Sequence, residues 1–204
     1  MNRLDALFEL HAADPSAFAI GYLTHLIDVL KRLDVRAIGR VMTALDECRR
    51  RGAHIYFIGN GGSAATASHF ANDLGVGMRA AGKPFRAVSL TDNVAVLTCV
   101  ANDQGYENIF LRQLELVLKP GDVLVAISAS GNSPSVLRAI EHANEQGNTT
   151  IGLVGFDGGA MKSLCKIVVH VETSRGEYGP VEDVHMVLDH LMASYFARAP
   201  CADR

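Results

Sequence analysis

Two loops rich in glycine and serine contain the residue types that bind an oxyanion. The first follows a short apolar run and consists of Gly59, Asn60, Gly61, Gly62 and Ser63. Glycine lets the backbone turn tightly and approach a ligand, and serine is a favoured N-cap of a helix. We therefore expect a helix to begin at about residue 64, with Ser63 as its cap.

The second loop adds hydroxyl groups to the same kind of turn. Ser128, Ser130 and Ser133 lie close together in the chain, and Pro134 follows the last of them. Proline after a serine cap is a strong signal for a helix start, and the free N–H groups of that start attract anions. Each loop alone is typical of an ordinary strand-to-helix turn, but the two together favour a phosphate site.

The first loop also fits part of a dinucleotide-binding pattern. Gly59, Gly61 and Ala64 have the GxGxxA spacing directly after an apolar run, which is the position that this pattern requires. The pattern also needs an acidic residue about 20 positions further on, whereas Asp92 comes more than thirty positions later. A dinucleotide site would leave the serine-rich loop without a role, so we favour the phosphate site.

Histidines and carboxylates recur at helical spacing in two later stretches. His69 and Asp73 are four residues apart and therefore share one face of the helix expected after the first loop. The last helix carries a second polar group, consisting of Glu182, His185, Asp189 and His190. A single histidine on an apolar helix face is usually only a hydrogen-bonded core or surface residue, so spacing alone does not establish a site.

The elements that must position these residues alternate between strand and helix. Short apolar runs occur at residues 55–58, 87–90, 123–127, 151–154 and 167–171. Helix-like stretches occur at residues 64–74, 109–118, 133–145, 160–164 and 181–197. This alternation predicts an α/β fold with a parallel sheet covered by helices on both faces. Ligands bind at the carboxyl ends of such strands, where both loops are expected.

The first fifty residues differ from the rest because they lack a strand pattern. Apolar residues at helical spacing predict two helices, over residues 16–33 and 35–51, with a short additional helix over 4–11. We therefore divide the chain into an N-terminal helical segment, residues 1–52, and a sheet domain, residues 53–204. A helical pair without its own sheet must bury its apolar stripe on the main domain or on another subunit.

Composition limits the classes of protein that remain. The chain has 204 residues, of which 49% are hydrophobic and 20% charged, and its net charge is −3. These values exclude intrinsic disorder and argue against a general nucleic-acid or anionic-membrane binder. The cysteines, Cys48, Cys99, Cys165 and Cys201, have no CxxC spacing and predict reduced packing residues. Together with the lack of a signal-peptide pattern and of a membrane-length apolar run, they predict a cytoplasmic protein.

Several segments occur in the same order as in a known family. They are the loop at 60–63, His69-Phe70-Ala71, Ala101-Asn102-Asp103, the run at 128–133 and the C-terminal helix. In this combination the chain resembles the sugar isomerase (SIS) domain proteins, in particular the phosphoheptose isomerases, which convert sedoheptulose 7-phosphate to the aldose heptose 7-phosphate. The resemblance implies a flavodoxin-like, five-stranded parallel sheet with an N-terminal helical pair. It also implies a homotetramer whose active sites form at the subunit interfaces.

The same resemblance assigns roles to individual residues. The expected substrate-binding positions are Asn60, Gly61, Gly62, Ser63, Asn102 and Asp103 for the sugar, and Ser128, Ala129, Ser130 and Ser133 for the phosphate. The positions that surround the reacting end of the sugar, and that bind zinc in some relatives, correspond to His69, Asp73, Glu182 and His190.

Three of these positions depart from the isomerase pattern. Ala129 stands where the isomerases have Thr, although its backbone N–H can still bind phosphate. Asp73 replaces Glu, which shortens the reach of the carboxylate by about 1.5 Å, and Glu182 replaces Gln, which adds a negative charge. Both keep oxygen ligands and make the quartet more attractive to zinc or another divalent ion. His185 and Asp189 are either partners that orient these ligands or polar residues on the outer face of the helix.

Aldose–ketose exchange requires a base that moves a proton between adjacent carbons through an enediol, and an acid that serves the carbonyl oxygen. We expect Asp73, or alternatively Glu182, to be the base and His190 to be the acid, with a divalent ion polarising the carbonyl. Such an enzyme makes a heptose precursor of lipopolysaccharide. Two alternatives stay open, namely a non-catalytic tetramer that binds the bacterial replication initiator and an isomerase of a different phosphosugar.

Overall fold

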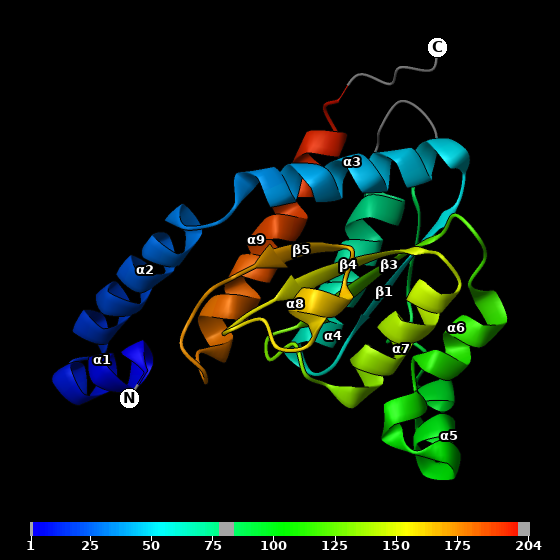
Figure 1. The fold of residues 1–204 in the computed structure, drawn as a ribbon. Helices are drawn as coiled ribbons and strands as arrows, with labels where there is room; N and C mark the ends of the chain where they lie inside the picture. Colours follow the sequence, from blue (N-terminus) through cyan, green and yellow to red (C-terminus); the bar gives the residue numbers. More distant parts are fainter. Residues whose placement is uncertain (1, 78–83, 200–204) are drawn as a thin grey trace.

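A parallel sheet of five strands organises residues 2–77 and 84–199, which are the residues described by this computed structural model (Figure 1). The strands are β1 (His54–Gly59), β2 (Arg86–Ser89), β3 (Val123–Ser128), β4 (Thr149–Val154) and β5 (Ile167–His170). Their order in the sheet is β2-β1-β3-β4-β5, and every neighbouring pair is parallel. This is the flavodoxin-like order, so the expected fold class is confirmed.

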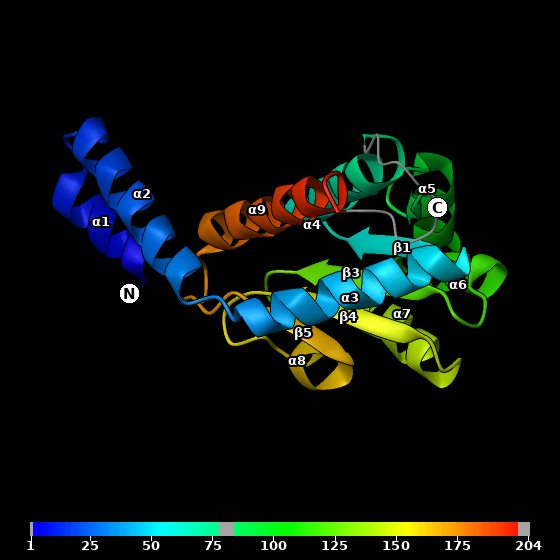
Figure 2. The same ribbon diagram turned by 90° about the horizontal axis from the view of Figure 1, so that it is seen from above.

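Helices cover both faces of this sheet, as the alternating pattern predicts. They are α3 (Val35–Arg51), α4 (Gly62–Asn72), α5 (Val94–Gln104), α6 (Leu111–Val117), α7 (Pro134–Glu145), α8 (Met161–Leu164) and α9 (Tyr178–Phe196). Alternate side chains of one strand point to opposite faces, so Phe57 belongs to the core cluster that includes side chains of α3, α4 and α9, while Ile58 belongs to the cluster that includes side chains of α5, α6, α7 and α8. Figure 2 shows α4 and α9 on one side of the sheet and α7 and α8 on the other.

The first loop leads into α4 in a way that differs from the sequence prediction. The helix begins at Gly62, and its N-cap is Gly61, whose φ of +57° is rarely adopted by residues with a side chain. Ser63 is buried inside the first turn, so the expected cap was wrong. At its other end α4 continues as a π-helical turn, Asp73–Gly77, a feature that is frequent at functional sites.

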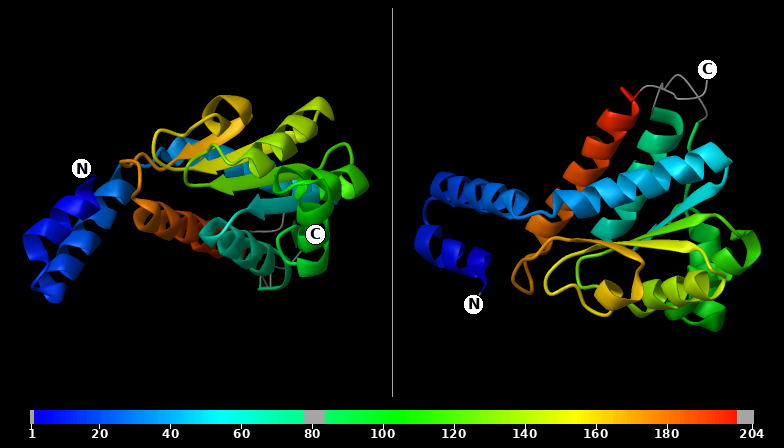
Figure 3. Two further views of the ribbon diagram at one scale, coloured as in Figure 1. Left: turned by 90° about the horizontal axis from the view of Figure 1, so that it is seen from below. Right: turned by 45° about the horizontal axis from the view of Figure 1, so that its top comes forward.

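The N-terminal helices α1 (Arg3–His11) and α2 (Pro15–Lys31) form a hairpin that projects from the sheet (Figures 1 and 3). Asp14 caps α2 by accepting hydrogen bonds from the N–H groups of Ser16 and Ala17, each at 3.0 Å. The helices α1, α2 and α3 confirm the three predicted near the N-terminus. Of these, α3 packs on the sheet, whereas α2 contacts α1 and the beginning of α9.

The cysteines only partly follow the packing prediction. Cys48 and Cys165 are buried free thiols, but Cys99 is exposed, and its thiol donates to Asp103 at 3.5 Å. Cys201 lies outside the described residues. Across residues 2–77 and 84–199, each helix is too short or too polar to cross a bilayer.

Candidate active site

The two glycine- and serine-rich loops meet where the strand order reverses. They follow β1 and β3, which are neighbours in the sheet although β2 separates them in the chain. Connections leave in opposite directions at such a point and open a crevice for ligands. A pocket of about 290 Å³ lies there, lined by both loops and by two side chains of α9, Tyr178 and Glu182.

The serine loop gathers three hydroxyl groups around one point. The Oγ of Ser128 lies 3.5 Å from the Oγ atoms of both Ser130 and Ser133. Ser133 is the N-cap residue of α7, and its hydroxyl makes no capping hydrogen bond. Because Pro134 has no N–H and the N–H of Val136 donates to the Ser133 carbonyl, the hydroxyl groups are the main donors that this loop offers to an anion. Three hydroxyls at a helix N-terminus can bind a phosphate group. Ala129, which lies between Ser128 and Ser130 in the chain, is buried and can offer a ligand only its backbone.

Asn60 connects the first loop to two other elements. Its Nδ2 donates to the Ser135 Oγ at 2.9 Å, and its Oδ1 accepts from the Tyr106 hydroxyl at 2.9 Å. Tyr106 belongs to a short 3₁₀ turn, Tyr106–Asn108, that follows α5. Sequence reasoning did not identify Tyr106, Ser135 or Tyr178, because nothing in their spacing relates them to the loop.

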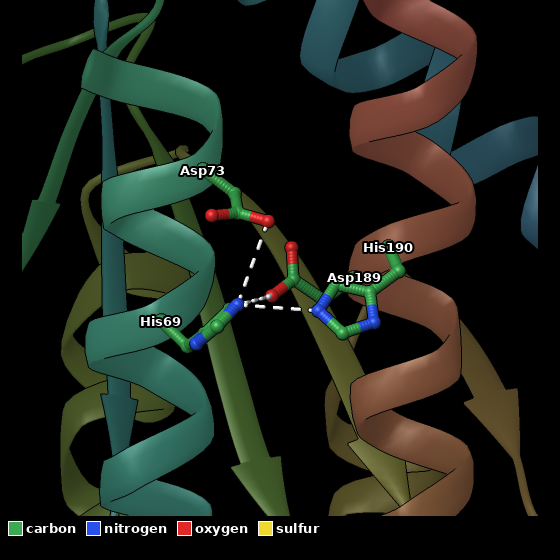
Figure 4. Close-up of side chains that lie close together, drawn as sticks. All are labelled: His69, Asp73, Asp189 and His190. Atoms are coloured by element: carbon green, nitrogen blue, oxygen red, sulfur yellow. Dashed lines mark hydrogen bonds and ion pairs between the residues drawn. The ribbon is translucent and has the colours of Figure 1, made fainter. Parts of the chain in front are cut away.

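A second polar group lies further along α4 and α9, which run side by side. It contains His69, Asp73, Asp189 and His190, and one potential ligand atom from each lies within 4.8 Å of all the others (Figure 4). The His69 Nε2 lies 3.2 Å from the His190 Nε2 and 3.5 Å from the Asp73 Oδ2. Tetrahedral zinc ligands at about 2.0–2.2 Å from the metal are roughly 3.3–3.6 Å from one another, so this donor set fits a divalent transition-metal ion.

The sequence left the position of Asp189 open, either as a partner of the ligands or on the outer face of the helix. Its exposed fraction is 0%, which rules out a position on the outer face of the helix. Neither carboxylate oxygen has a hydrogen-bond partner among the described residues, and the His69 Nε2 lies 3.9 Å from Oδ2. Burial and, secondarily, the charge of Asp73 raise the pKa of Asp189 to about 7.

Replacing Asp189 with Asn is expected to stabilise the metal-free protein at pH 8. The ordinary pKa of the carboxyl is 3.8, whereas the folded-state pKa is raised to about 7. Between these values the folded state holds a proton that the unfolded chain has released, so the free energy of unfolding falls as pH rises from about 4 to about 7. The difference corresponds to at most about 4 kcal/mol, less the cost of burying an unpaired amide. Urea unfolding in EDTA should show a stabilised variant at pH 8 but not near pH 4, and equal stabilities at pH 8 would contradict this expectation.

The other expected residues lie at three different places. Glu182 faces the loop pocket, where a Cβ atom on Gly62 would come within 2.3 Å of its carboxylate. Burial and the neighbouring charge of Asp183 raise its pKa. His185 is completely buried, and burial lowers its pKa to about 4, so it stays neutral. Asn102 and Asp103 are exposed on α5, outside the loop pocket, and the Asn102 Nδ2 donates to the Asp103 Oδ1 at 2.7 Å.

Comparison with known proteins places this architecture in a family. The model of the SIS domain matches residues 20–155. The phosphoheptose isomerase of Rhodospirillum rubrum is 39% identical over 166 residues, which cover 81% of this chain and 87% of that protein. The phosphoheptose isomerase of Aquifex aeolicus is 32% identical over 98% of both chains.

Solved structures agree with these sequence relationships. The structure of phosphoheptose isomerase from Neisseria gonorrhoeae superposes with a TM-score of 0.81 at 29% identity, covering 89% of this chain and 97% of that one. The phosphoheptose isomerase structure from Francisella tularensis, at 24% identity and a TM-score of 0.79, shows the same fold. The chain therefore belongs to the SIS domain family, in the group formed by the phosphoheptose isomerases.

Proposed function

We propose that this protein is a phosphoheptose isomerase that converts sedoheptulose 7-phosphate to D-glycero-D-manno-heptose 7-phosphate. The observation that carries this proposal is the arrangement of two sites along one pair of helices. The loop pocket, which the serine loop and the beginnings of α4 and α9 line, is suited to phosphate, and the His69–Asp73–Asp189–His190 cluster lies further along the same two helices. Relatives named for this activity span most of the chain.

The distance between the two sites suits the length of a heptose phosphate. Gly62 at the loop and His69 in the cluster are seven residues apart on α4, which is roughly 10 Å along a helix. An extended chain of seven carbons covers roughly 8 Å, because each C–C bond of about 1.5 Å advances it by roughly 1.3 Å, and the phosphate group adds to that length. A substrate anchored by phosphate at Ser128, Ser130 and Ser133 can therefore present its carbonyl end to the cluster.

The chain supplies the groups that the isomerisation needs. In our proposal Asp73 is the base that takes the proton beside the carbonyl and returns it to the adjacent carbon, and His190 serves the carbonyl oxygen as acid. Glu182, which lies between the loop pocket and the cluster along α9, is the alternative base. The phosphate anchor supplies binding energy that orients a flexible open-chain sugar. A zinc or similar divalent ion held by His69, Asp73 and His190 would polarise the carbonyl.

We further propose that the enzyme is a cytoplasmic homotetramer whose N-terminal segment, residues 1–52, contributes to the interface. The projecting hairpin exposes several large apolar side chains, which are Phe8, Leu10, Ile20, Leu23 and Ile27. Exposed apolar surface of this kind is typical of an interface. Asn102 and Asp103 lie outside the pocket of their own chain, and in an interfacial site they would contact the sugar bound to a neighbouring subunit.

Turnover of a panel of sugars tests the proposed substrate. The purified protein, with added zinc or with EDTA, is incubated with sedoheptulose 7-phosphate, unphosphorylated sedoheptulose and fructose 6-phosphate. We expect the aldose heptose 7-phosphate to be the product and the unphosphorylated sugar to react at least about 100-fold more slowly, because the oriented phosphate anchor is lost. Faster turnover of fructose 6-phosphate would indicate a different phosphosugar. Lack of turnover with every sugar and metal condition would favour the non-catalytic, initiator-binding alternative.

A further inference from the structure

A buried carboxylate without hydrogen bonds usually has a function, because taking an ionised group out of water is unfavourable unless an opposite charge compensates for it. Both oxygens of Asp189 are in this state within the described part of the chain. Its carboxylate nevertheless points toward the space between His69, Asp73 and His190 rather than away from it (Figure 4). Without a cation, Asp189 also faces the negative charge of Asp73. The cluster therefore gathers two carboxylates and two imidazoles around one space that suits a cation.

The packing of α4 against α9 determines which carboxylate of α9 reaches this point. Glu182 and Asp189 are seven residues apart, which places them on nearly the same face of α9, two turns and roughly 10 Å from each other. Gly62 and His69 have the same separation on α4. Glu182 lies against Gly62, and Asp189 lies beside His69. The two carboxylates of α9 therefore lie against different parts of α4.

We propose that Asp189, rather than Glu182, is the fourth protein ligand of a divalent transition-metal ion held with His69, Asp73 and His190. Two imidazoles and two carboxylates suit zinc and its neighbours in the first transition series, and two negative charges compensate the charge of the ion. Glu182 is then free to act on the substrate between the serine loop and the cluster. This proposal rests on the isomerase site described above, but it is tested by metal binding rather than by turnover.

Zinc affinity of the metal-free protein distinguishes the two carboxylates. Competition with a chromophoric chelator is measured for the wild type, Asp189→Asn, Glu182→Ala and Asp183→Asn. Asp183→Asn removes a negative charge from the same helix, but the Asp183 carboxylate accepts a hydrogen bond from the Tyr22 hydroxyl on α2 and does not face the cluster. This variant therefore measures the effect on zinc affinity of losing a nearby negative charge. We expect Asp189→Asn to weaken zinc binding by at least about 10-fold, the smallest loss typical of a group that holds a metal site together. The other two variants should stay within a few-fold of the wild type.

The coordination itself gives a second readout. Cobalt(II) replaces zinc in such sites, and its visible absorption depends on the number and type of ligands. The cobalt spectrum should change in Asp189→Asn and Asp189→Leu and should be retained in Glu182→Ala. The Leu variant fills the buried position with an apolar side chain, and circular dichroism and urea unfolding establish that each variant is folded.

Three results would overturn the proposal. They are a wild type that binds neither zinc nor cobalt, unchanged affinity in both folded Asp189 variants, and a loss in Glu182→Ala as large as that in Asp189→Asn. A wild type that binds zinc through Asp189 but does not turn over sedoheptulose 7-phosphate would leave this assignment intact and reject the proposed function instead.

Discussion

Asp73→Asn is expected to lower kcat for sedoheptulose 7-phosphate by about 10²- to 10⁴-fold, the usual contribution of a positioned acid or base. The amide keeps the size of the side chain but cannot accept the proton from the carbon beside the carbonyl. His190→Ala should cause a comparable loss. KM should change little in either variant, because the hydroxyls of Ser128, Ser130 and Ser133, which we propose bind the phosphate, lie on a different loop.

The assay must separate proton transfer from metal binding, because the Asp73 Oδ2 also lies 3.5 Å from the His69 Nε2. Rates are therefore measured at saturating zinc, with the metal content of each sample determined. Asp28→Asn on α2, which lies outside both the loop pocket and the cluster, is the matched carboxylate control. Full activity of zinc-loaded Asp73→Asn would reject Asp73 as the base and leave Glu182 as the candidate.

The double variant Leu23→Asp/Ile27→Asp is expected to dissociate the proposed oligomer and to abolish activity. These side chains are 58% and 51% exposed on one face of α2, and burying two unpaired charges per subunit in an apolar interface costs several kcal/mol for each charge. Activity should fall with assembly, because Asn102 and Asp103 would then lose the contact with a neighbouring subunit's site that we propose for them. Light scattering after size-exclusion chromatography and the isomerase assay measure the two effects.

Leu116→Asp provides the control for that experiment. Leu116 is also an exposed apolar residue, but it lies on α6, far from the hairpin in Figure 1. The Leu116→Asp variant should assemble and turn over the substrate nearly as the wild type does. If the α2 variant stays assembled and active, the hairpin does not form an interface that the site needs.

The sheet and its loops were predictable because their signals are local. Each strand is a continuous apolar run, and the loops after β1 and β3 contain glycine and serine at the carboxyl ends of their strands. In contrast, α5 gave no helical stripe, because Val100 is its only buried residue within the described chain, and sequence reasoning missed it. Gly61 capped α4 instead of Ser63 because its backbone conformation is one that favours glycine.

The candidate site was predictable only within each helix. Spacing placed His69 beside Asp73, and it grouped Glu182, His185, Asp189 and His190 on α9. It did not show whether Glu182 or Asp189 faces His69, because that depends on the position of α9 relative to α4 along their common direction. In the folded protein Glu182 lies against Gly62, whose missing side chain leaves room for the Glu182 carboxylate. Asp189 is thereby placed beside the histidines.

Proton NMR of sedoheptulose 7-phosphate in D₂O tests the central claim most directly. An enediol formed by Asp73 or Glu182 exchanges a proton of the ketose C1 with solvent and produces the aldose. With zinc-loaded, assembled protein, we predict loss of C1 proton intensity together with growth of an aldose heptose 7-phosphate that carries deuterium at C2. Persistence of both C1 protons, with no aldose formed at any zinc concentration, would contradict the account.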